Sequence, residues 1–345
     1  MPSAADPPIV AALREQQAAL GRPLRFDEFM HHALYGAHGF YTAAGGRAGR
    51  RGDFLTSPEV GPLFGAVVAR WVDAEFERQG RPDGFTVVEV GAGPGALARS
   101  VLLAAPHLRG RYLAVEVSAA QRASHPDGVQ SSAELPEQPL PGVVIANELL
   151  DNLPFRLAVH DGGWREALVQ VGPDGRPSEV LAPAPQEWAW LPRSAPHGAR
   201  VPVQAAAREW VAAARRTLHP GGTVLAFDYC TARTAALALE PWRTWLRTYR
   251  GHERGEHYLR SIGEQDITAQ VCLDQLPEAD AVRTQAQFLQ RWGITELVEE
   301  GRLAWEAAAG RPDLAALRMR SRVREAESLL DPAGLGGFVA VEWRA

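Results

Sequence analysis

The sequence contains no lysine, so all of its formal positive charge comes from arginine. A Walker A phosphate-binding loop requires a lysine, and a pyridoxal phosphate enzyme holds its cofactor through a lysine Schiff base. Both classes of protein are therefore excluded.

Cysteine is nearly absent as well, since only Cys230 and Cys272 occur in 345 residues. Two cysteines so far apart make neither a disulfide framework nor a cysteine-built zinc site, and we predict no bound metal. The formal net charge of −5 gives no reason to expect nucleic acid, which usually requires a concentrated basic face.

Long hydrophobic runs are also missing, because no stretch approaches the roughly 20 apolar residues that cross a bilayer. The first residues, MPSAADPPIVAALREQQ, have no basic segment leading into an apolar one and are not rich in arginine. Neither a secretory signal nor an organellar transit peptide is expected. We therefore expect a cytoplasmic protein without membrane insertion.

From residue 85 onward, strand-like runs alternate with helix-like segments. The strand-like runs are FTVVEV, RYLAVEV, PGVVIANE, TVLAFDY and GGFVAVEW, and the helix-like segments are GALARSVLLAA, QRASH and QAAAREWVAAARRTL. VVEV, YLAVEV and VVIAN do not alternate in polarity, which is typical of parallel strands covered on both faces. We predict an α/β fold with a doubly wound, Rossmann-like sheet.

Other segments surround this sheet. Apolar residues of FDEFMHHALYG share one helix face, and a long helix should begin at Ser57-Pro58 with the serine as its cap. RLAVHDGGWREALVQV predicts a hairpin, and the Pro/Ala-rich PSEVLAPAPQEWAWLPRSAPHG predicts a surface loop. We divide the chain into an N-terminal helical region (1–80), a core (81–231 and 331–345) and a cap insertion on the substrate side (232–330).

A glycine-rich turn follows the first strand. Gly91, Ala92 and Gly93 lie in GAGPGA, which fits the fingerprint G-x-G-x-x-G/A of dinucleotide sites. Glu116, at the end of the second strand, is placed to accept hydrogen bonds from a ribose diol. Both features suit a nicotinamide dinucleotide, a flavin or S-adenosylmethionine, and the glycines alone could be steric.

Two residues near this turn separate the candidate ligands. Glu89 lies two residues before the first glycine, where a carboxylate would repel a pyrophosphate and attract an ammonium or sulfonium group. Pro94 removes an N–H that a phosphate cradle would use. Both residues favour S-adenosylmethionine.

Polar residues also follow the third strand, in ANELLDNLP. Asn147, Glu148 and Asp151 come just after its carboxyl end, the edge where ligands bind in open α/β sheets. Glu148 and Asp151 are three residues apart, so on one helical turn they would point to the same side. The alternative is a helix start at which acids favour the helix dipole.

These stretches resemble the MidA family of class I S-adenosylmethionine-dependent methyltransferases, whose mitochondrial member is complex I assembly factor 7. The matching stretches are FDEFMHHALYGAHGFYT, GDFLTSPEVGPLFG, VVEVGAGPGALA, NELLDNLPFRL, GTVLAFDY, GEQDITAQVCL, TQAQFLQRWGI and GLGGFVAVEW. They follow the family order, the first seven between about residue 26 and residue 292. The resemblance implies a class I methyltransferase fold and S-adenosyl-L-methionine as the cofactor.

The resemblance also implies positions for cofactor contacts. It places GDFLTSPE against the cofactor, and Gly91, Gly93 and Glu116 on its methionine and ribose parts. The implied cofactor-binding residues are Gly52, Asp53, Thr56, Ser57, Glu89, Gly91, Ala92, Gly93, Glu116, Val117, Asn147 and Glu148. The chain departs from the family where Cys230 follows FDY in place of glycine, and in the segment LRTYRGHERGEHYLRS. These departures lie on the substrate side.

The mitochondrial member of the family dimethylates an arginine on a subunit of respiratory complex I. The resemblance therefore implies a protein substrate that bears an arginine, and complex I assembly as a role. Glu148, Asp151 and Asp53 are candidate catalytic residues, because carboxylates can orient a planar guanidinium bidentately. His257 could accept a proton afterwards, although a satisfied surface histidine is the preferred interpretation, and Cys230 is expected to be a small buried residue rather than a nucleophile.

Three alternatives remain open at this stage. A methyltransferase of the same fold could act on a small molecule or on another protein side chain. The chain could instead be a non-catalytic assembly factor that keeps the fold for partner binding, or a nicotinamide dehydrogenase. The helical N-terminus is also a candidate surface for a homodimer.

Overall fold

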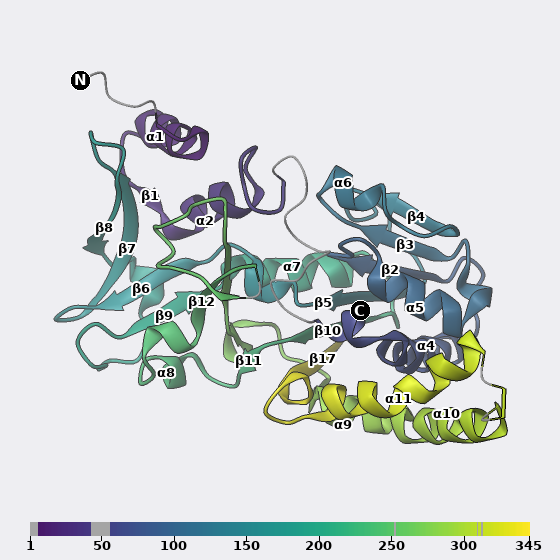
Figure 1. Cartoon of the computed structure of the whole chain (residues 1–345). Helices are drawn as coiled ribbons and strands as arrows, with labels where there is room; N and C mark the ends of the chain where they lie inside the picture. The colour runs from purple at the N-terminus through teal and green to yellow at the C-terminus, as the bar shows by residue number, and fades with distance from the viewer. Residues whose placement is uncertain (1–5, 43–55, 252, 309, 312) are drawn as a thin grey trace. The chain divides into compact units, whose positions relative to one another are not determined.

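The computed structural model describes residues 6–42, 56–251, 253–308, 310–311 and 313–345. These residues form two compact units, each made of three segments that alternate along the sequence (Figure 1). The first unit takes the described residues within 1–53, 150–211 and 229–277, and the second takes those within 54–149, 212–228 and 278–345. The predicted cap segment 232–330 is therefore shared between the two units.

The described part of the second unit contains a seven-stranded sheet in the order β16-β17-β10-β5-β2-β3-β4. Its strands are β2 (Thr86–Val90), β3 (Tyr112–Val115), β4 (Val129–Ser132), β5 (Gly142–Asn147), β10 (Thr223–Asp228), β16 (Ala281–Thr284) and β17 (Val339–Arg344). The strands from β10 to β4 are parallel, and β17 is antiparallel to both of its neighbours. The chain builds outward from β2 through β3 to β4, then returns to β5 and β10, which confirms the predicted doubly wound sheet.

Helices pack on this sheet. They are α3 (Ser57–Val60), α4 (Pro62–Arg78), α5 (Ala96–Ala104), α6 (Ala119–Arg122), α9 (Gln285–Arg291), α10 (Ile294–Ala308) and α11 (Leu314–Leu330), with the 3-10 turns η1 (Pro106–Leu108) and η6 (Leu335–Gly337). One face of α4 is fully buried, through Phe64, Val67, Val68 and Trp71. Figure 1 shows α10 and α11 running side by side, and both contact α4.

The predicted long helix from Ser57 is wrong in one respect, because the chain breaks at Gly61 and a new helix starts at Pro62. A Cβ at Gly61 would lie 2.3 Å from the carboxyl carbon of Glu325, whose Oε2 accepts a hydrogen bond from the Leu63 N–H at 2.8 Å. Ser57 is not the cap either. It is buried, and its hydroxyl donates to Gln285 Oε1 at 2.9 Å.

The first unit is built around an antiparallel sheet in the order β1-β7-β6-β9, with β8 also paired to β7. Its strands are β1 (Leu24–Arg25), β6 (Arg156–His160), β7 (Trp164–Val171), β8 (Pro177–Pro183) and β9 (Arg200–Val203). Strands β6 and β7 pair around Asp161–Gly163, which confirms the predicted hairpin. The predicted loop that begins at Pro177 is wrong over its first seven residues, which belong to β8. Prolines occupy only the two ends of this strand, where they break no central ladder.

Short elements complete the first unit. They are the helices α1 (Pro8–Leu20), α2 (Phe26–Tyr35) and α8 (Thr234–Leu237), the strands β11 (Cys230–Thr231), β12 (Leu246–Arg250), β13 (Glu253–Arg254), β14 (Asp266–Ala269) and β15 (Val271–Cys272), and the 3-10 turns η2 (Leu150–Asn152), η3 (Gln186–Trp188), η4 (Trp242–Thr244) and η5 (Leu273–Gln275). The boundary between the units falls within α7 (Ala205–Arg216). The predicted apolar face of α2 is fully buried, and Phe26 meets Tyr258 edge-on with ring centroids 5.0 Å apart.

Candidate active site

The glycine turn lies between β2 and α5 and has a left-handed backbone at two key positions. Gly91 has φ +70° and Gly93 has φ +55°. A Cβ at Gly91 would lie 3.1 Å from Leu149 Cδ1, and one at Gly93 would lie 3.3 Å from Gln121 Oε1. Backbone conformation and close packing therefore both require glycine here.

Every backbone N–H of residues 91–95 is already used within the second unit. Gly91 and Ala92 donate to the Val115 carbonyl at 2.9 and 3.2 Å, and Gly95 donates to the Ala92 carbonyl at 2.9 Å. Gly93 donates to Glu116 Oε2 at 3.0 Å, and Pro94 has no N–H. A phosphate bound at this turn would need such donors. The turn therefore suits a ligand without a pyrophosphate.

Glu116 follows β3 and is held by backbone donors. Besides the Gly93 contact, its Oε1 accepts from the Ser118 N–H at 2.8 Å, and the residue is 8% exposed. Each carboxylate oxygen can accept two hydrogen bonds, so one acceptor position per oxygen remains after these contacts. This capacity matches the two hydroxyls of a ribose. Val117, the next residue, is 52% exposed at the same strand end.

Glu89 behaves differently from the sequence-based expectation. Its carboxyl group is buried, and burial raises its pKa to about 8, although the Tyr112 hydroxyl (2.7 Å) and the Ala98 N–H both donate to it. A carboxyl group with this pKa is largely protonated at neutral pH. The predicted repulsion of phosphate by a Glu89 charge is therefore wrong. The consumed N–H groups of the turn replace it as the argument against a dinucleotide.

Asn147 ends β5, and Glu148 follows it at the edge of the sheet. The Glu148 N–H donates to the Phe227 carbonyl of β10 at 2.8 Å, and Glu148 has φ +51°. The Asn147 side-chain amide donates through Nδ2 to Glu148 Oε1 at 3.1 Å. Its Oδ1 is buried and has no hydrogen-bond partner among the described residues. A buried acceptor without a partner and a left-handed non-glycine backbone are both typical of functional sites.

Asp151 does not share a helical turn with Glu148, so that prediction is wrong. The contact with β10 keeps Glu148 in the ladder, and η2 begins only at Leu150. Glu148 belongs to the second unit and Asp151 to the first. Asp151 is buried, and its Oδ2 accepts a hydrogen bond from the Thr268 hydroxyl.

The segment from the resemblance that contains GDFLTSPE is described only from Thr56 onward, so Gly52 and Asp53 lie outside the described residues. The Thr56 N–H donates to Glu59 Oε2 at 3.3 Å, next to buried Ser57. Both residues precede α4 in the second unit, the unit that also contains the glycine turn. Their contacts with a cofactor stay a prediction.

A comparison with known protein families identifies the family of this chain. A family model described as "Putative S-adenosyl-L-methionine-dependent methyltransferase" matches residues 67–291, more than half of the chain. The chain belongs to this family. The MidA resemblance and the class I methyltransferase fold are thereby confirmed, and the cofactor of the family is S-adenosyl-L-methionine.

Individual relatives agree with this family. The chain is 32% identical over 183 residues to the mitochondrial protein arginine methyltransferase NDUFAF7 homolog of Drosophila melanogaster, which covers 43% of this chain and 42% of that protein. It is 26% identical over 318 residues to the protein arginine methyltransferase NDUFAF7 of Danio rerio, covering 79% and 74%. The fly alignment thus spans less than half the length of that relative.

A solved structure covers nearly the whole chain. It is a superfamily member from Burkholderia thailandensis, described as a "likely methyl transferase" and crystallised bound to S-adenosyl-homocysteine. The two chains are 26% identical, with a TM-score of 0.82 over 98% of this chain and 92% of the other. A native structure of a protein from the same organism gives a TM-score of 0.80.

The second unit of this chain fits the family's cofactor chemically. S-adenosylmethionine contains a ribose, for which Glu116 keeps acceptor capacity, a positively charged sulfonium and a zwitterionic amino-acid end. It contains no phosphate, and the turn offers none of its own N–H groups to one. No helix in the described part of the chain combines the length and hydrophobicity needed to span a membrane.

Sequence reasoning missed one residue at the turn, His125. Its Nε2 lies 2.9 Å from the Gly93 carbonyl oxygen, and its Nδ1 lies 2.6 Å from Ser131 Oγ. A carbonyl can only accept, so Nε2 carries the proton and donates. The segment QRASH contained no signal for this contact, because His125 and Gly93 are 32 residues apart.

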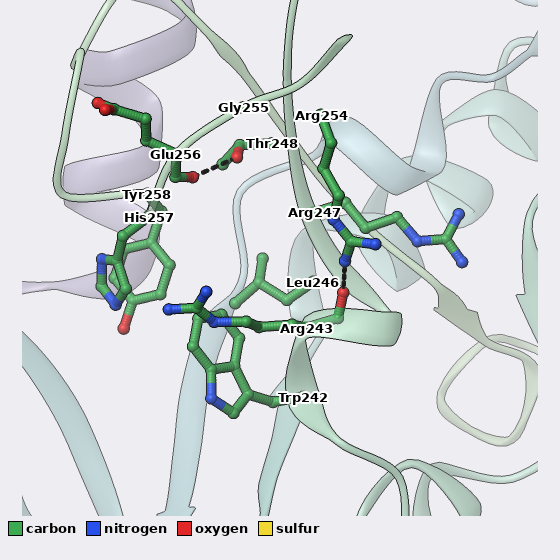
Figure 2. A pocket seen from close by; sticks show the side chains of 10 residues that line it. All are labelled: Trp242, Arg243, Leu246, Arg247, Thr248, Arg254, Gly255, Glu256, His257 and Tyr258. Carbon is green, nitrogen blue, oxygen red and sulfur yellow. Dashed lines mark hydrogen bonds between the residues drawn. The ribbon is translucent and has the colours of Figure 1, made fainter.

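His257 lies in the first unit, beside a pocket of about 80 Å³ (Figure 2). Burial and then the charge of Arg243 lower the pKa of its imidazole. Nδ1 accepts from the Leu259 N–H at 3.2 Å, so the neutral ring carries its proton on Nε2. His257 can gain a proton only by giving up this contact, which favours the interpretation of a satisfied histidine.

The same pocket is lined by three arginines that contact their own unit. Arg243 lies over the Trp242 ring, 5.1 Å from its centroid, and Arg254 donates to the Arg243 carbonyl (Figure 2). Arg247 Nε donates to the Thr244 carbonyl at 2.6 Å. These contacts are structural, and the pocket lies in a different unit from the glycine turn.

The two cysteines have no feature of a nucleophile. Cys230, in β11, is only half-buried, so the expectation of a buried residue is wrong for it. Cys272 is buried, and burial raises the pKa of its thiol to about 12. A thiol with this pKa is not ionised at neutral pH.

Proposed function

We propose that this chain transfers methyl groups from S-adenosyl-L-methionine to a guanidinium nitrogen of an arginine in a protein substrate. Family membership and the NDUFAF7 relatives named protein arginine methyltransferases support the proposal. The observation that carries it is the row of acceptors at the carboxyl edge of the second unit's sheet. Glu116, Asn147 and Glu148 offer oxygens to donor and cationic groups, next to a turn without a phosphate cradle.

The cofactor supplies an activated methyl group on a sulfonium. The acceptor nitrogen forms a bond to the methyl carbon while the carbon–sulfur bond breaks, the electron pair of that bond stays on sulfur, and one proton passes from the nitrogen to water. The leaving group needs no protonation, so the protein mainly positions the reactants. Holding a near-attack geometry lowers the activation free energy by on the order of 7–11 kcal/mol.

Glu148 is the carboxylate best placed to orient the acceptor, because it follows β5 at the ligand edge of the sheet. We expect it to accept N–H groups of the planar guanidinium and to localise the cation's charge away from the attacking nitrogen. Asp151 and Asp53 stay candidates for the same role.

The proposal is tested with purified protein, radiolabelled cofactor and a lysate of the host lacking this gene as the acceptor mixture. Mass spectrometry of the labelled proteins should find the methyl groups on arginine. Glu148→Gln should lower turnover by about 10- to 100-fold, the loss of one hydrogen bond to a charged group. Gln130→Ala, which removes an exposed amide from β4, should leave turnover unchanged.

Label on another side chain or on a small molecule would contradict arginine specificity. Cofactor binding without any transfer would favour a non-catalytic assembly factor. Four statements stay predictions from the sequence. They are a subunit of respiratory complex I as the substrate, a role in complex I assembly, a cytoplasmic location and a homodimeric state. The labelled protein and its cellular fraction test the first three, and light scattering of the purified chain tests the fourth.

A further inference from the structure

One acceptor atom at the sheet edge accepts no hydrogen bond from the described residues. Asn147 Oδ1 is buried and lacks a hydrogen-bond partner among the described residues. Leaving such an acceptor unsatisfied is unfavourable for folding, and native structures contain few of them. Because Asn147 is the last residue of β5, the cost occurs at the edge where a ligand is expected.

The orientation of this amide is fixed by its neighbour. Nδ2 donates to Glu148 Oε1 at 3.1 Å, and a flipped amide would set two acceptor oxygens against each other. Glu148 is itself held, because its N–H is bonded to the Phe227 carbonyl and its backbone is left-handed. Oδ1 is therefore the part of the amide that remains for a donor from a ligand.

The position of Asn147 along the edge indicates which donor it meets. Ala146 pairs with Val90 of β2, and Val90 pairs with Val115 of β3, so Asn147 and Glu116 end strands on either side of β2. Two strand spacings separate them by about 10 Å. If Glu116 holds the ribose at the end of β3, the ligand edge of the sheet continues past the glycine turn after β2 to β5. Asn147 is then better placed to meet the group that receives the methyl than to meet the ribose.

We infer that Asn147 Oδ1 accepts a hydrogen bond from an N–H of the methyl-accepting group, an inference that rests on the proposed function. Asn147 and Glu148 together present two linked acceptors, which fit two N–H groups of one planar guanidinium. A hydrogen bond in the plane of the guanidinium leaves the face of its nitrogen directed at the methyl carbon. Asn147 was predicted from sequence to bind the cofactor. The inference assigns it to the acceptor.

Two variants separate these roles. Asn147→Ala and Asn147→Leu should bind S-adenosylhomocysteine with a Kd within about twofold of wild type, because neither removes a cofactor contact. Their kcat on the lysate acceptor should fall by about 10- to 100-fold, with a smaller change in the KM for the cofactor. Asn147→Leu should unfold near the wild-type temperature, since removing a buried acceptor without a partner offsets the loss of the Nδ2 hydrogen bond to Glu148. Gln130→Ala again serves as the matched control.

Other outcomes overturn the inference. A Kd for S-adenosylhomocysteine that rises as much as turnover falls would make Asn147 a cofactor residue. Unchanged turnover would remove it from the reaction, and loss of cooperative unfolding in both variants would make its role structural.

The proposed function can fail separately from this inference. If wild type methylates a nitrogen other than that of arginine and the variants lose this activity with normal S-adenosylhomocysteine binding, only arginine specificity fails. A methyl group found on an oxygen or carbon that bears no N–H would overturn both.

Discussion

Each compact unit contains a glutamate whose carboxyl group is wholly or largely buried. The pKa values of these two carboxyl groups shift in opposite directions. In the second unit, burial raises the pKa of Glu89 to about 8, with a tyrosine hydroxyl and a backbone N–H as its donors. In the first unit, burial also opposes ionisation of Glu179, but hydrogen bonds and charge from Arg200, together with the Tyr258 hydroxyl, lower its pKa. A guanidinium partner accounts for the difference.

The comparison separates two ways of using buried polar groups. Arg200 binds Glu179 through two nitrogens, at 2.6 and 2.8 Å, and stacks over Trp242, so these two charges of the first unit are paired within the protein. In the second unit, Glu116 is held by backbone N–H groups and Asn147 keeps an acceptor without a partner. Polar groups that a fold leaves with spare capacity are the ones available to a ligand.

The largest expected effect comes from breaking the pair in the first unit. Arg200→Met should lower the free energy of unfolding by about 3 kcal/mol, because Glu179 would keep its charge in a largely buried site without a counter-ion. Urea denaturation followed by circular dichroism measures this change. The double variant Glu179→Met/Arg200→Met should recover most of the loss, since no buried charge remains. A loss below about 1 kcal/mol in the single variant would place the pair with ordinary surface ion pairs.

The second prediction concerns the unpaired member, Glu89. Its pKa in the folded chain, about 8, lies above the ordinary value of 4.5, so the folded state holds a proton that the unfolded state has lost. The stabilisation is complete below about pH 4.5 and disappears as the pH rises through about 8. Between about pH 6 and pH 8, the free energy of unfolding of wild type should fall by about 2 kcal/mol relative to Glu89→Gln.

Urea denaturation without cofactor at several pH values provides this measurement. Glu134→Gln, which changes an exposed glutamate in the second unit, is the control and should follow the wild-type profile. Parallel profiles for wild type and Glu89→Gln would mean that Glu89 is ionised in the folded chain. In that case, the electrostatic argument first made from the sequence would hold again.

The same contrast explains what the sequence could predict. The inner strands of the second unit were predicted correctly, because a parallel sheet covered on both faces needs continuous apolar runs, as in VVEV and VVIAN. The glycine turn and Glu116 were identified because strand, turn and helix are contiguous in the chain. Strands β4 and β16 were missed because both are short and largely half-buried or exposed, so no apolar run marks them.

Features set by distant contacts could not be predicted from local patterns. The helix break at Gly61 depends on Glu325, more than 250 residues later, and the protonation of Glu89 depends on burial that only the fold creates. The assumed helical turn through Glu148 and Asp151 was wrong because Glu148 is bonded to β10, far along the chain. Spacing of three residues predicts a shared face only where the backbone is helical.

The smallest expected effect tests how the ligand turn is held without ion pairs. His125 links the Gly93 carbonyl to Ser131 of β4, and Gly93 also donates to Glu116, so His125 supports the glycine that holds Glu116, the predicted ribose acceptor. His125→Ala should weaken S-adenosylhomocysteine binding by about fivefold, equivalent to about 1 kcal/mol for one hydrogen bond. The kcat should change less than this Kd, because the residue positions the turn and does not touch the acceptor.

Isothermal titration calorimetry with S-adenosylhomocysteine measures the effect. Ser131→Ala is the matched variant, since it leaves the Gly93 contact in place and removes only the partner of Nδ1. It should weaken binding by less than about twofold, because the ring keeps its donor to the carbonyl. Equal losses in the two variants would mean that the turn depends on both hydrogen bonds that connect Gly93 through His125 to Ser131 of β4. No loss in either would mean that the glycine backbone holds its conformation through Glu116 and Val115 alone.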